Sequence, residues 1–225
     1  MKNVLVIEDD LDISELISYN LEKSGYKVHH AENGNDGLII LGEVVCDIIL
    51  LDLMLPGLKG MDFLKIIRSS ENYCNIPVII ISAKTSEHDI ISGLNDGADD
   101  YLPKPFSMEM LNAKIKTVLR RGSSYTGRTS QIIEYKGIKI DDANHKVYID
   151  GSEITLTHKE YELLHLFLSN TDMVFSRDML LNSIWGYDNQ SYTRTVDSHV
   201  ASLRKKLNHY GSIIKSVSKV GYGIQ

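Results

Sequence analysis

The first 121 residues alternate short apolar runs with segments whose apolar residues recur at helical spacing. The short runs are rich in Val, Ile and Leu, which is typical of strands buried on both faces of a sheet. Because a helix separates successive strands, we expect a parallel sheet with right-handed crossovers. Strands are predicted at 3–7, 26–30, 47–52, 77–82 and 99–102, and helices at 11–23, 34–45, 60–68, 87–95 and 107–121.

The pattern changes in the second half of the chain. From 132 to 157 apolar and polar residues alternate, and turn signals interrupt the alternation, so a small antiparallel sheet is predicted there. Three helices follow: the first begins at a capping box that starts with Thr157, the second is capped by Ser176, and the third begins near Thr193. A final hairpin is expected within 213–224.

The charge distribution divides the chain in the same place. Residues 1–122 carry 12 Lys/Arg and 19 Asp/Glu (12 − 19 = −7), whereas 123–225 carry 12 and 11 (12 − 11 = +1), which together give −6. The segment between the halves is small, polar and aperiodic, as linkers are. We therefore predict a first domain at 1–121, a linker at 122–131 and a second domain at 132–225.

Composition excludes several classes of protein. No apolar run approaches the roughly 20 residues of a membrane helix, and the first residues lack a signal-peptide pattern. The two cysteines, Cys46 and Cys74, lie in apolar segments, which suggests reduced thiols in a cytoplasmic protein. A sequence pI near 5.7 argues against nonspecific nucleic-acid binding by the whole chain and leaves a local basic face open.

Chemically useful side chains follow several strands of the predicted parallel sheet, at the edge where open α/β sheets form sites. They are Glu8, Asp9 and Asp10 after the first strand, Asp52 after the third, Ser82 after the fourth and Lys104 after the fifth. Clustered carboxylates repel one another, and Mg²⁺ relieves that repulsion while also binding phosphate. Asp52 is then a candidate nucleophile toward phosphorus, with Lys104 and the Ser82 hydroxyl stabilising phosphoryl oxygens.

Each of these residues alone has an ordinary structural explanation. A single acid at a strand end is usually a turn residue, and Asp9-Asp10 can cap the following helix. The combination of acid pair, acid, hydroxyl and lysine at successive strand ends of one sheet favours a phosphoryl-transfer site.

Four segments resemble the receiver domain of bacterial two-component response regulators. They are VIEDD at 6–10, LDLMLPG at 51–57, ISA at 81–83 and GADDYLPKPF at 97–106, and the resemblance extends over all of 1–121.

The resemblance implies a five-stranded, flavodoxin-like (CheY-like) fold in which a histidine kinase phosphorylates Asp52. It also implies Mg²⁺ ligands from Asp9, Asp52 and the Met54 backbone carbonyl, with Glu8 acting through water. Ser82 and Tyr101 match the pair that changes position on phosphorylation, and Lys104-Pro105 matches a cis peptide bond.

In the relatives with winged-helix effectors, phosphorylation drives dimerisation through the fourth helix, fifth strand and fifth helix. Asp100 and Lys114 match one ion pair of that face. Ile90 and Met110 stand where an Arg and a Glu are usual, which suggests an apolar contact between subunits that salt would weaken less. The alternative is that Ile90 packs within its own domain.

The third helix of the second domain has an apolar stripe at Val196, Val200, Leu203 and Leu207. At 100° per residue, the opposite face carries Arg194, Ser198, Ala201, Ser202 and Lys205, flanked by Arg204 and Lys206. A short-polar, basic face suits a major groove, and Lys219 in the final hairpin suits the DNA backbone or minor groove. A solvated amphipathic helix is the simpler alternative.

The second half, from 132 to 224, resembles the α+β winged helix-turn-helix domain of the OmpR/PhoB family. WG at 185–186, TRTVDSHV at 193–200 and GY at 221–222 carry the resemblance, which implies that Trp185 and Arg194 contact phosphate. Ala201 and Ser202 stand at positions where relatives often have Arg. This chain is therefore expected to make fewer bidentate contacts to guanine than they do, each worth about 1–3 kcal/mol. We therefore expect a weak monomer that relies on dimeric binding to direct repeats.

The resulting hypothesis is a phosphorylation-dependent transcription regulator, not an enzyme. Its expected partners are a sensor histidine kinase, double-stranded promoter DNA and a second copy of the chain, with RNA polymerase as a further candidate and no membrane. One alternative is an aspartate-dependent phosphohydrolase, but such enzymes need a second Asp two residues after the nucleophile, where this chain has Met54. The other alternative is a DNA-binding or interaction protein that acts without phosphorylation.

Overall fold

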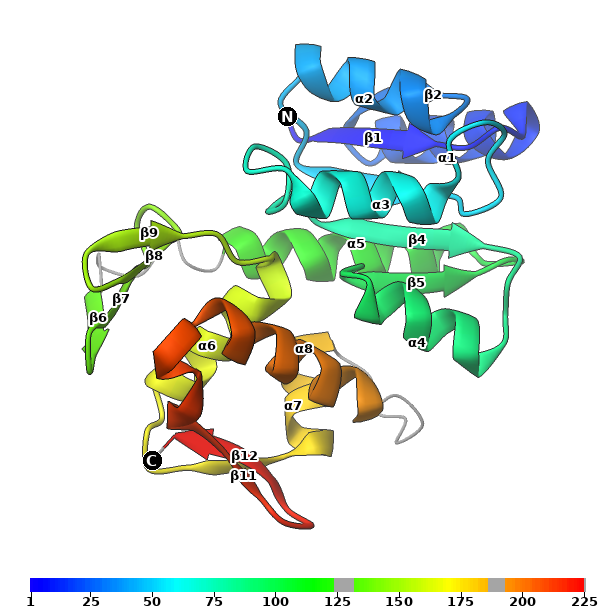
Figure 1. Ribbon diagram of the computed structural model, residues 1–225. Helices are drawn as coiled ribbons and strands as arrows, with labels where there is room; N and C mark the ends of the chain where they lie inside the picture. Colours follow the sequence, from blue (N-terminus) through cyan, green and yellow to red (C-terminus); the bar gives the residue numbers. More distant parts are fainter. Residues whose placement is uncertain (124–131, 186–192, 225) are drawn as a thin grey trace. The chain divides into compact units, whose positions relative to one another are not determined.

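The computed structural model describes residues 1–123, 132–185 and 193–224 (Figure 1). The chain divides into two compact units, Met1–Gly122 and Ser123–Gln225, which are described separately below. Most of the predicted linker, 124–131, lies outside the described residues. Among the described helices, none combines the length and apolar character needed to cross a membrane.

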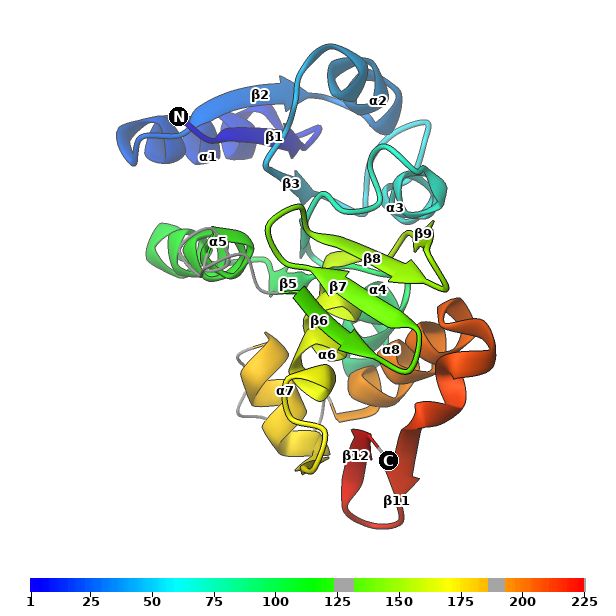
Figure 2. The ribbon, with the colours of Figure 1, turned by 90° about the vertical axis from the view of Figure 1, so that its left-hand side faces the viewer.

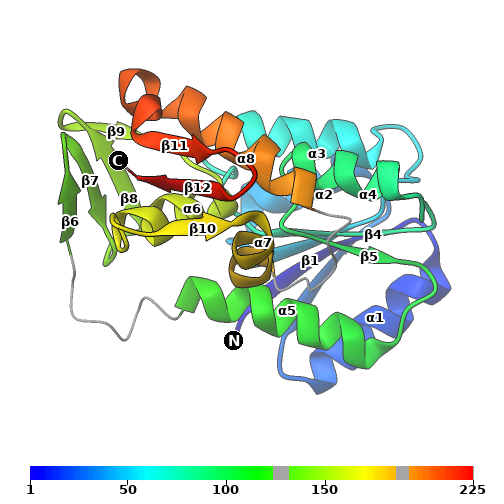
Figure 3. The ribbon, with the colours of Figure 1, turned by 90° about the horizontal axis from the view of Figure 1, so that it is seen from below.

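The first unit is a five-stranded parallel sheet with helices on both faces, as predicted. The strands run in the order β2-β1-β3-β4-β5, and Figure 3 shows α1 and α5 on one face with α2, α3 and α4 on the other. The strands are β1 (Asn3–Ile7), β2 (Lys27–Ala31), β3 (Ile48–Leu51), β4 (Val78–Ser82) and β5 (Asp100–Pro103); the helices are α1 (Leu11–Lys23), α2 (Gly34–Glu43), α3 (Gly60–Ser69), α4 (Glu87–Asn95) and α5 (Met108–Ser123).

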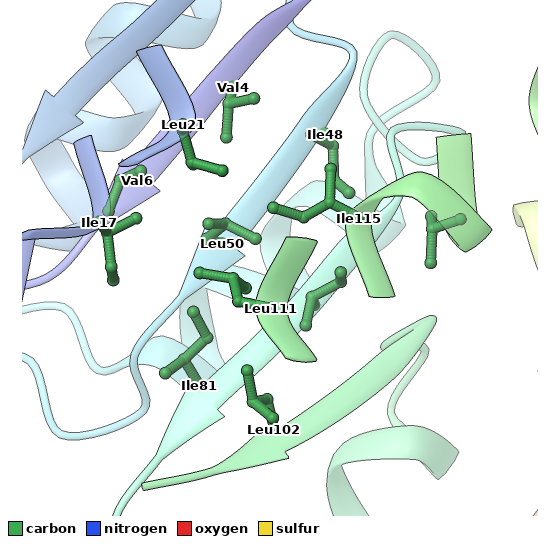
Figure 4. Packing of buried hydrophobic residues seen from close by; sticks show 12 residues of the cluster. Val4, Val6, Ile17, Leu21, Ile48, Leu50, Ile81, Leu102, Leu111 and Ile115 are labelled. Atoms are coloured by element: carbon green, nitrogen blue, oxygen red, sulfur yellow. The ribbon is translucent and has the colours of Figure 1, made fainter. Parts of the chain in front are cut away.

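The core of this unit explains why the strands are uniformly apolar. One cluster packs β1, β3, β4 and β5 against α1 and α5 (Figure 4). Ile17 and Leu21 of α1 and Leu111 and Ile115 of α5 reach this cluster and are at most 1% exposed. Observed boundaries differ from the predicted ones by at most two residues, because the apolar pattern marks burial while hydrogen bonding marks the end of an element.

The second unit is α+β, as predicted. Its first sheet is antiparallel with the order β6-β7-β8-β9, and β6, β7 and β8 lie side by side in Figure 2. Its strands are β6 (Ile132–Tyr135), β7 (Ile138–Asp141), β8 (Lys146–Ile149) and β9 (Ser152–Ile154), followed by helices α6 (His158–Leu168), α7 (Arg177–Trp185) and α8 (Thr193–Lys206) and the 3-10 helix η2 (Asn208–Ile213).

The predicted final hairpin is β11 (Ile214–Val217) with β12 (Gly221–Ile224). It gains a third strand, β10 (Val174–Ser176), which pairs with β12 and which the sequence pattern did not indicate. A run of three residues is too short to show alternation, so the sequence signal was lacking. The capping box at Thr157 and the cap from Ser176 are both present.

Candidate phosphoacceptor and nucleic-acid sites

Three predicted site residues meet at the carboxyl edge of the parallel sheet. Glu8 follows β1, Asp52 follows β3 and Lys104 follows β5. The Lys104 ammonium lies 2.5 Å from Asp52 Oδ2 and 2.8 and 2.7 Å from the two Glu8 oxygens. All three side chains are at most 16% exposed, so the ammonium bridges two carboxylates where water screens them little.

The acidic group has the donor set of a magnesium site. Glu8, Asp9 and Asp52 each offer one carboxylate oxygen, and these oxygens lie within 4.8 Å of one another. Hard oxygen donors at this spacing fit Mg²⁺, with water and phosphate completing its shell. Asp10 has a different role, because its Oδ1 accepts from the N–H groups of Asp12 and Ile13 and so caps α1.

The bridge shifts the pKa values of Glu8 and Lys104. Burial raises the pKa of the Glu8 carboxyl, and the charge of Asp52 adds to this, against the lowering effect of Lys104. Burial lowers the pKa of Lys104, but hydrogen bonds and charge attraction from Asp52 and Glu8 outweigh it, and the net shift is upward. Lys104 therefore stays a cation at neutral pH.

Backbone contacts hold the loop after β3 in place. The Met54 N–H donates to Asp52 Oδ1 at 2.9 Å, which fixes the carboxylate beside the end of β3. Gly60, the first residue of α3, packs so closely that a Cβ there would overlap the carbonyl oxygen of Asp52. The sequence does not distinguish Gly60 from other helix-start glycines, because only the packing of α3 on this loop sets it apart.

Ser82 and Tyr101 lie close to the same edge and are both buried. Ser82 is 0% exposed and accepts the Lys84 N–H at 3.3 Å, while the Tyr101 hydroxyl donates to the Lys84 carbonyl at 2.9 Å. Burial raises the pKa of Tyr101. Both residues thus hold the segment between β4 and α4. The Lys104-Pro105 bond is cis, as the resemblance implied.

The residues expected on a dimer face divide into two groups. Lys114 Nζ lies 2.7 Å from Asp100 Oδ1 within the same chain, and Met110 is 52% exposed. Ile90 is only 7% exposed. The predicted apolar contact between subunits therefore lacks an exposed side chain at Ile90, because this side chain is buried.

Three residues of α8 that were predicted to contact DNA make polar contacts within their own domain. Ser202 donates to Glu160 Oε1 at 2.6 Å, and Lys206 lies 2.6 Å from Glu160 Oε2, so both side chains contact α6. Arg204 donates to the Ile214 carbonyl at 2.6 Å and so contacts β11. These three residues were predicted to contact DNA, but their polar groups are engaged within the domain.

Trp185 needs a similar correction. Its side chain is 3% exposed and makes an edge-on contact with His199, with ring centroids 5.0 Å apart, so it is a core residue here. Lys205 and Lys219 are exposed, and Ser198 is partly buried. The side chain of Arg194 lies outside the described residues.

Comparison with known proteins agrees with both halves of the structure. Residues 4–116 match the family model for the response regulator receiver domain, and 151–224 match the model for the C-terminal domain of transcriptional regulatory proteins. The chain belongs to the OmpR/PhoB family of response regulators. It is thus a two-component response regulator that acts as a transcription factor.

Relatives in this family match over nearly the whole chain. The phosphate regulon transcriptional regulatory protein PhoB of Klebsiella pneumoniae is 38% identical and covers 98% of this chain and 96% of its own length. Response regulator ArlR of Staphylococcus aureus (strain Mu50 / ATCC 700699) is 38% identical, with both chains fully covered. These OmpR/PhoB relatives are named as regulators rather than as enzymes.

Solved structures of response regulators show the same architecture. A mutant of RitR matches with a TM-score of 0.78 at 28% identity, covering 100% of this chain and 99% of that one. DrrB of Thermotoga maritima, described as an OmpR/PhoB homolog, matches at 28% identity over 100% and 99% of the two chains, with a TM-score of 0.51.

Proposed function

We propose that this response regulator is switched by phosphorylation of Asp52 and binds promoter DNA as a phosphorylated dimer. The observation that carries the proposal is the Lys104 ammonium placed between Asp52 and Glu8. A buried acid that is held beside a fixed cation is suited to accept a phosphoryl group.

The chemistry follows from the side chains at this edge of the sheet. An Asp52 carboxylate oxygen forms a bond to phosphorus while the phosphorus–nitrogen bond of a phosphohistidine on the sensor kinase breaks. Glu8, Asp9, Asp52 and the Met54 carbonyl would hold Mg²⁺, which supplies charge stabilisation for the phosphoryl group. Lys104 neutralises a phosphoryl oxygen as a compact cation, and the Ser82 hydroxyl donates to another.

The signal would pass from the phosphate to the surface formed by α4, β5 and α5. A phosphoryl group adds roughly −1.5 to −2 charge at pH 7. If the Ser82 hydroxyl moved toward the phosphoryl group, it would lose its hydrogen bond from the Lys84 N–H. Lys84 belongs to the segment that the Tyr101 hydroxyl also holds. Dimerisation through this surface would then involve the exposed Met110. Asp100 and Lys114, which pair within one chain, would instead form ion pairs between subunits.

The second unit would supply DNA recognition. Lys205 on α8 and Lys219 between β11 and β12 are exposed cations suited to binding phosphate. Arg194, in the first turn of α8, is a further proposed phosphate contact. The proposed division of labour is a phosphoacceptor domain at 1–121, a linker at 122–131 and a DNA-binding domain at 132–225. RNA polymerase is a further proposed partner of the DNA-bound dimer.

Phosphorylation can be tested by incubating the full chain with acetyl phosphate and Mg²⁺ and recording its intact mass. We expect a stable gain of about 80 Da, which is one phosphoryl group. Asp52→Asn should abolish the gain, whereas the matched control Asp62→Asn, an exposed acid of α3, should keep it. Consumption of acetyl phosphate without a mass gain would support the phosphohydrolase alternative instead.

DNA binding can be tested by selecting fragments from a random library with and without phosphorylation. Selective enrichment only after phosphorylation is the expected result. Equal enrichment by the phosphorylated chain and by Asp52→Asn would favour the regulator that acts without phosphorylation, and no enrichment in either case would contradict DNA recognition.

A further inference from the structure

A buried carboxylate attaches one flank of α8 to α6. Glu160 is 2% exposed, and its two oxygens accept from the Ser202 hydroxyl and the Lys206 ammonium, both at 2.6 Å. Ser202 and Lys206 are one turn apart, so a single acid contacts α8 at two successive turns. Burial raises the pKa of Glu160, but Lys206, Ser202 and the Thr157 N–H outweigh it, and the net shift is downward. The flank is thus held by a charged group.

A tyrosine attaches the opposite flank of α8 to the hairpin. The Tyr222 hydroxyl of β12 donates to Asp197 Oδ1 at 2.6 Å, and Arg177 donates to the same oxygen at 2.7 Å. The guanidinium groups of Arg177 and Arg204 lie 4.9 and 5.5 Å from the centre of the Tyr222 ring. Arg204 also donates to the Ile214 carbonyl of β11. Helix α8 is therefore attached to β12 through Tyr222 and to β11 through Arg204.

The two attachments lie on either side of the apolar stripe. At about 100° per residue, with Val196 set at zero, Asp197 and Arg204 fall near 80–100° and Ser202 and Lys206 near 240–280°. The core residues lie between these flanks. The remaining arc, near 140–200°, holds Ser198, Ala201 and Lys205, of which Ala201 and Lys205 are exposed and Ser198 is partly buried.

We propose that Glu160 and Tyr222 are positioning residues for DNA recognition, which fix the rotation of α8 from opposite flanks so that Ala201 and Lys205 face outward. Neither residue contacts DNA in this proposal; each acts through α8. The inference rests on the proposed function of the second unit as a DNA reader.

Rotation matters because base readout tolerates little displacement. A side chain at the helix surface lies about 5–6 Å from the axis, so a 20° turn moves it by about 2 Å. Direct hydrogen bonds to bases need donor–acceptor distances of about 2.7–3.2 Å, and such a displacement breaks them. Contacts to phosphate from flexible lysines survive it, because their charge acts over a longer range.

The test uses Glu160→Gln and Tyr222→Phe in the full phosphorylated chain. Tyr222→Phe keeps the ring that both guanidinium groups contact and removes only the hydroxyl. The matched controls are Glu153→Gln, which breaks the exposed 2.7 Å pair with Lys146, and Tyr210→Phe, which removes a 2.8 Å bond to Asp150. Affinity is measured for a site enriched by the unsubstituted chain and for unrelated DNA, together with thermal unfolding.

A positioning role predicts that the ratio of specific to nonspecific affinity falls at least ten-fold in both variants. Nonspecific affinity, which comes from phosphate contacts, should change less than about two-fold, and both controls should resemble the unsubstituted chain. A parallel fall in both affinities, or an unchanged ratio in a variant that unfolds normally, would refute the positioning role.

The result also separates this inference from the function on which it rests. If Glu160→Gln does not fold, Ser202→Ala replaces it in the test, because it removes one of the two contacts of Glu160 from the α8 side. If the unsubstituted chain selects no sequence at all, the proposed DNA recognition fails and the positioning role falls with it. If the unsubstituted chain selects a DNA sequence and the variants keep the same ratio of specific to nonspecific affinity, only the positioning role is overturned.

Discussion

The carboxyl edge of the first unit and helix α8 of the second unit differ in how far the sequence predicts their contacts. At the edge, Glu8, Asp52 and Lys104 are far apart in the chain and were predicted to meet, and the Lys104 ammonium lies within 2.8 Å of both carboxylates. On α8, Ser202 and Lys206 were predicted to face outward, and both contact the buried Glu160.

The difference comes from what determines each position. In a parallel sheet, the carboxyl ends of all strands lie at the same edge. A residue that directly follows a strand is therefore located at that edge as soon as the end of the strand is known. On a helix, periodicity gives the angle of a residue but not which neighbour covers its flank. Long polar side chains at the border of the apolar stripe can reach either solvent or a buried partner. The following predictions test this contrast, beginning with the largest expected effect.

Trp185→Ala tests whether the indole belongs to the core or to a DNA-contact surface. Because the side chain is 3% exposed, we expect the second unit to lose about 3–5 kcal/mol of unfolding free energy. Denaturant unfolding followed by circular dichroism measures this, with Met179→Ala, a 46% exposed position on the same helix, as the control. Unchanged unfolding with weaker DNA binding would restore the phosphate-contact interpretation.

Lys104→Gln tests the convergence at the carboxyl edge. Removing one fixed charge from a phosphoryl-transfer site typically costs a factor of about 10²–10³ in rate, so phosphorylation by acetyl phosphate should slow by about that factor. The rate is followed by intact mass. Lys84→Gln, at a nearby exposed lysine, should react normally, and equal rates for the two variants would remove Lys104 from the chemistry.

His145 provides a pH-dependent test of the second unit. Its ring stacks on Tyr161 at 3.7 Å, and burial, aided by His158 and opposed by Asp142 and Glu162, lowers its pKa from 6.5 to about 4. Between these values the unfolded chain binds more protons, so stability falls as the pH decreases from 6.5 toward 4, by at most about 3 kcal/mol.

The measurement for His145 is urea unfolding of the full chain at several pH values, followed by the fluorescence of the single tryptophan. His145→Asn keeps a residue type that tolerates the left-handed backbone at φ 53 and should flatten the pH dependence. His209→Asn, at an exposed histidine, should leave it as in the unsubstituted chain. An equally steep dependence in His145→Asn would assign the effect to other groups.

Lys205→Ala gives the smallest expected effect and tests the outward face of α8. A lost phosphate contact lowers affinity for all DNA sequences alike and reduces the slope of log affinity against log salt by about 0.9. Lys139→Ala on the four-stranded sheet should leave the slope unchanged. A loss restricted to one base position would instead show that Lys205 reads a base.

The sequence alone determined the order of elements apart from β10 and η2, the switch from a parallel to an antiparallel sheet, and the strand ends at which Glu8, Asp9 and Asp52 gather. Those features depend on local apolar periodicity and on strand ends, both of which are encoded within a few residues. It also showed Glu160 as part of a capping box with Thr157, an interaction spanning three residues.

Tertiary structure decided the remaining features. The second role of Glu160 as the partner of Lys206, 46 residues away, depends on how α6 packs on α8. The burial of Ile90 and Trp185, the close approach of Gly60 to Asp52 and the pairing of β10 with β12 likewise depend on contacts between elements. Such contacts leave no local pattern, because the same side chains at the same spacing can face water or a neighbouring helix until the elements pack.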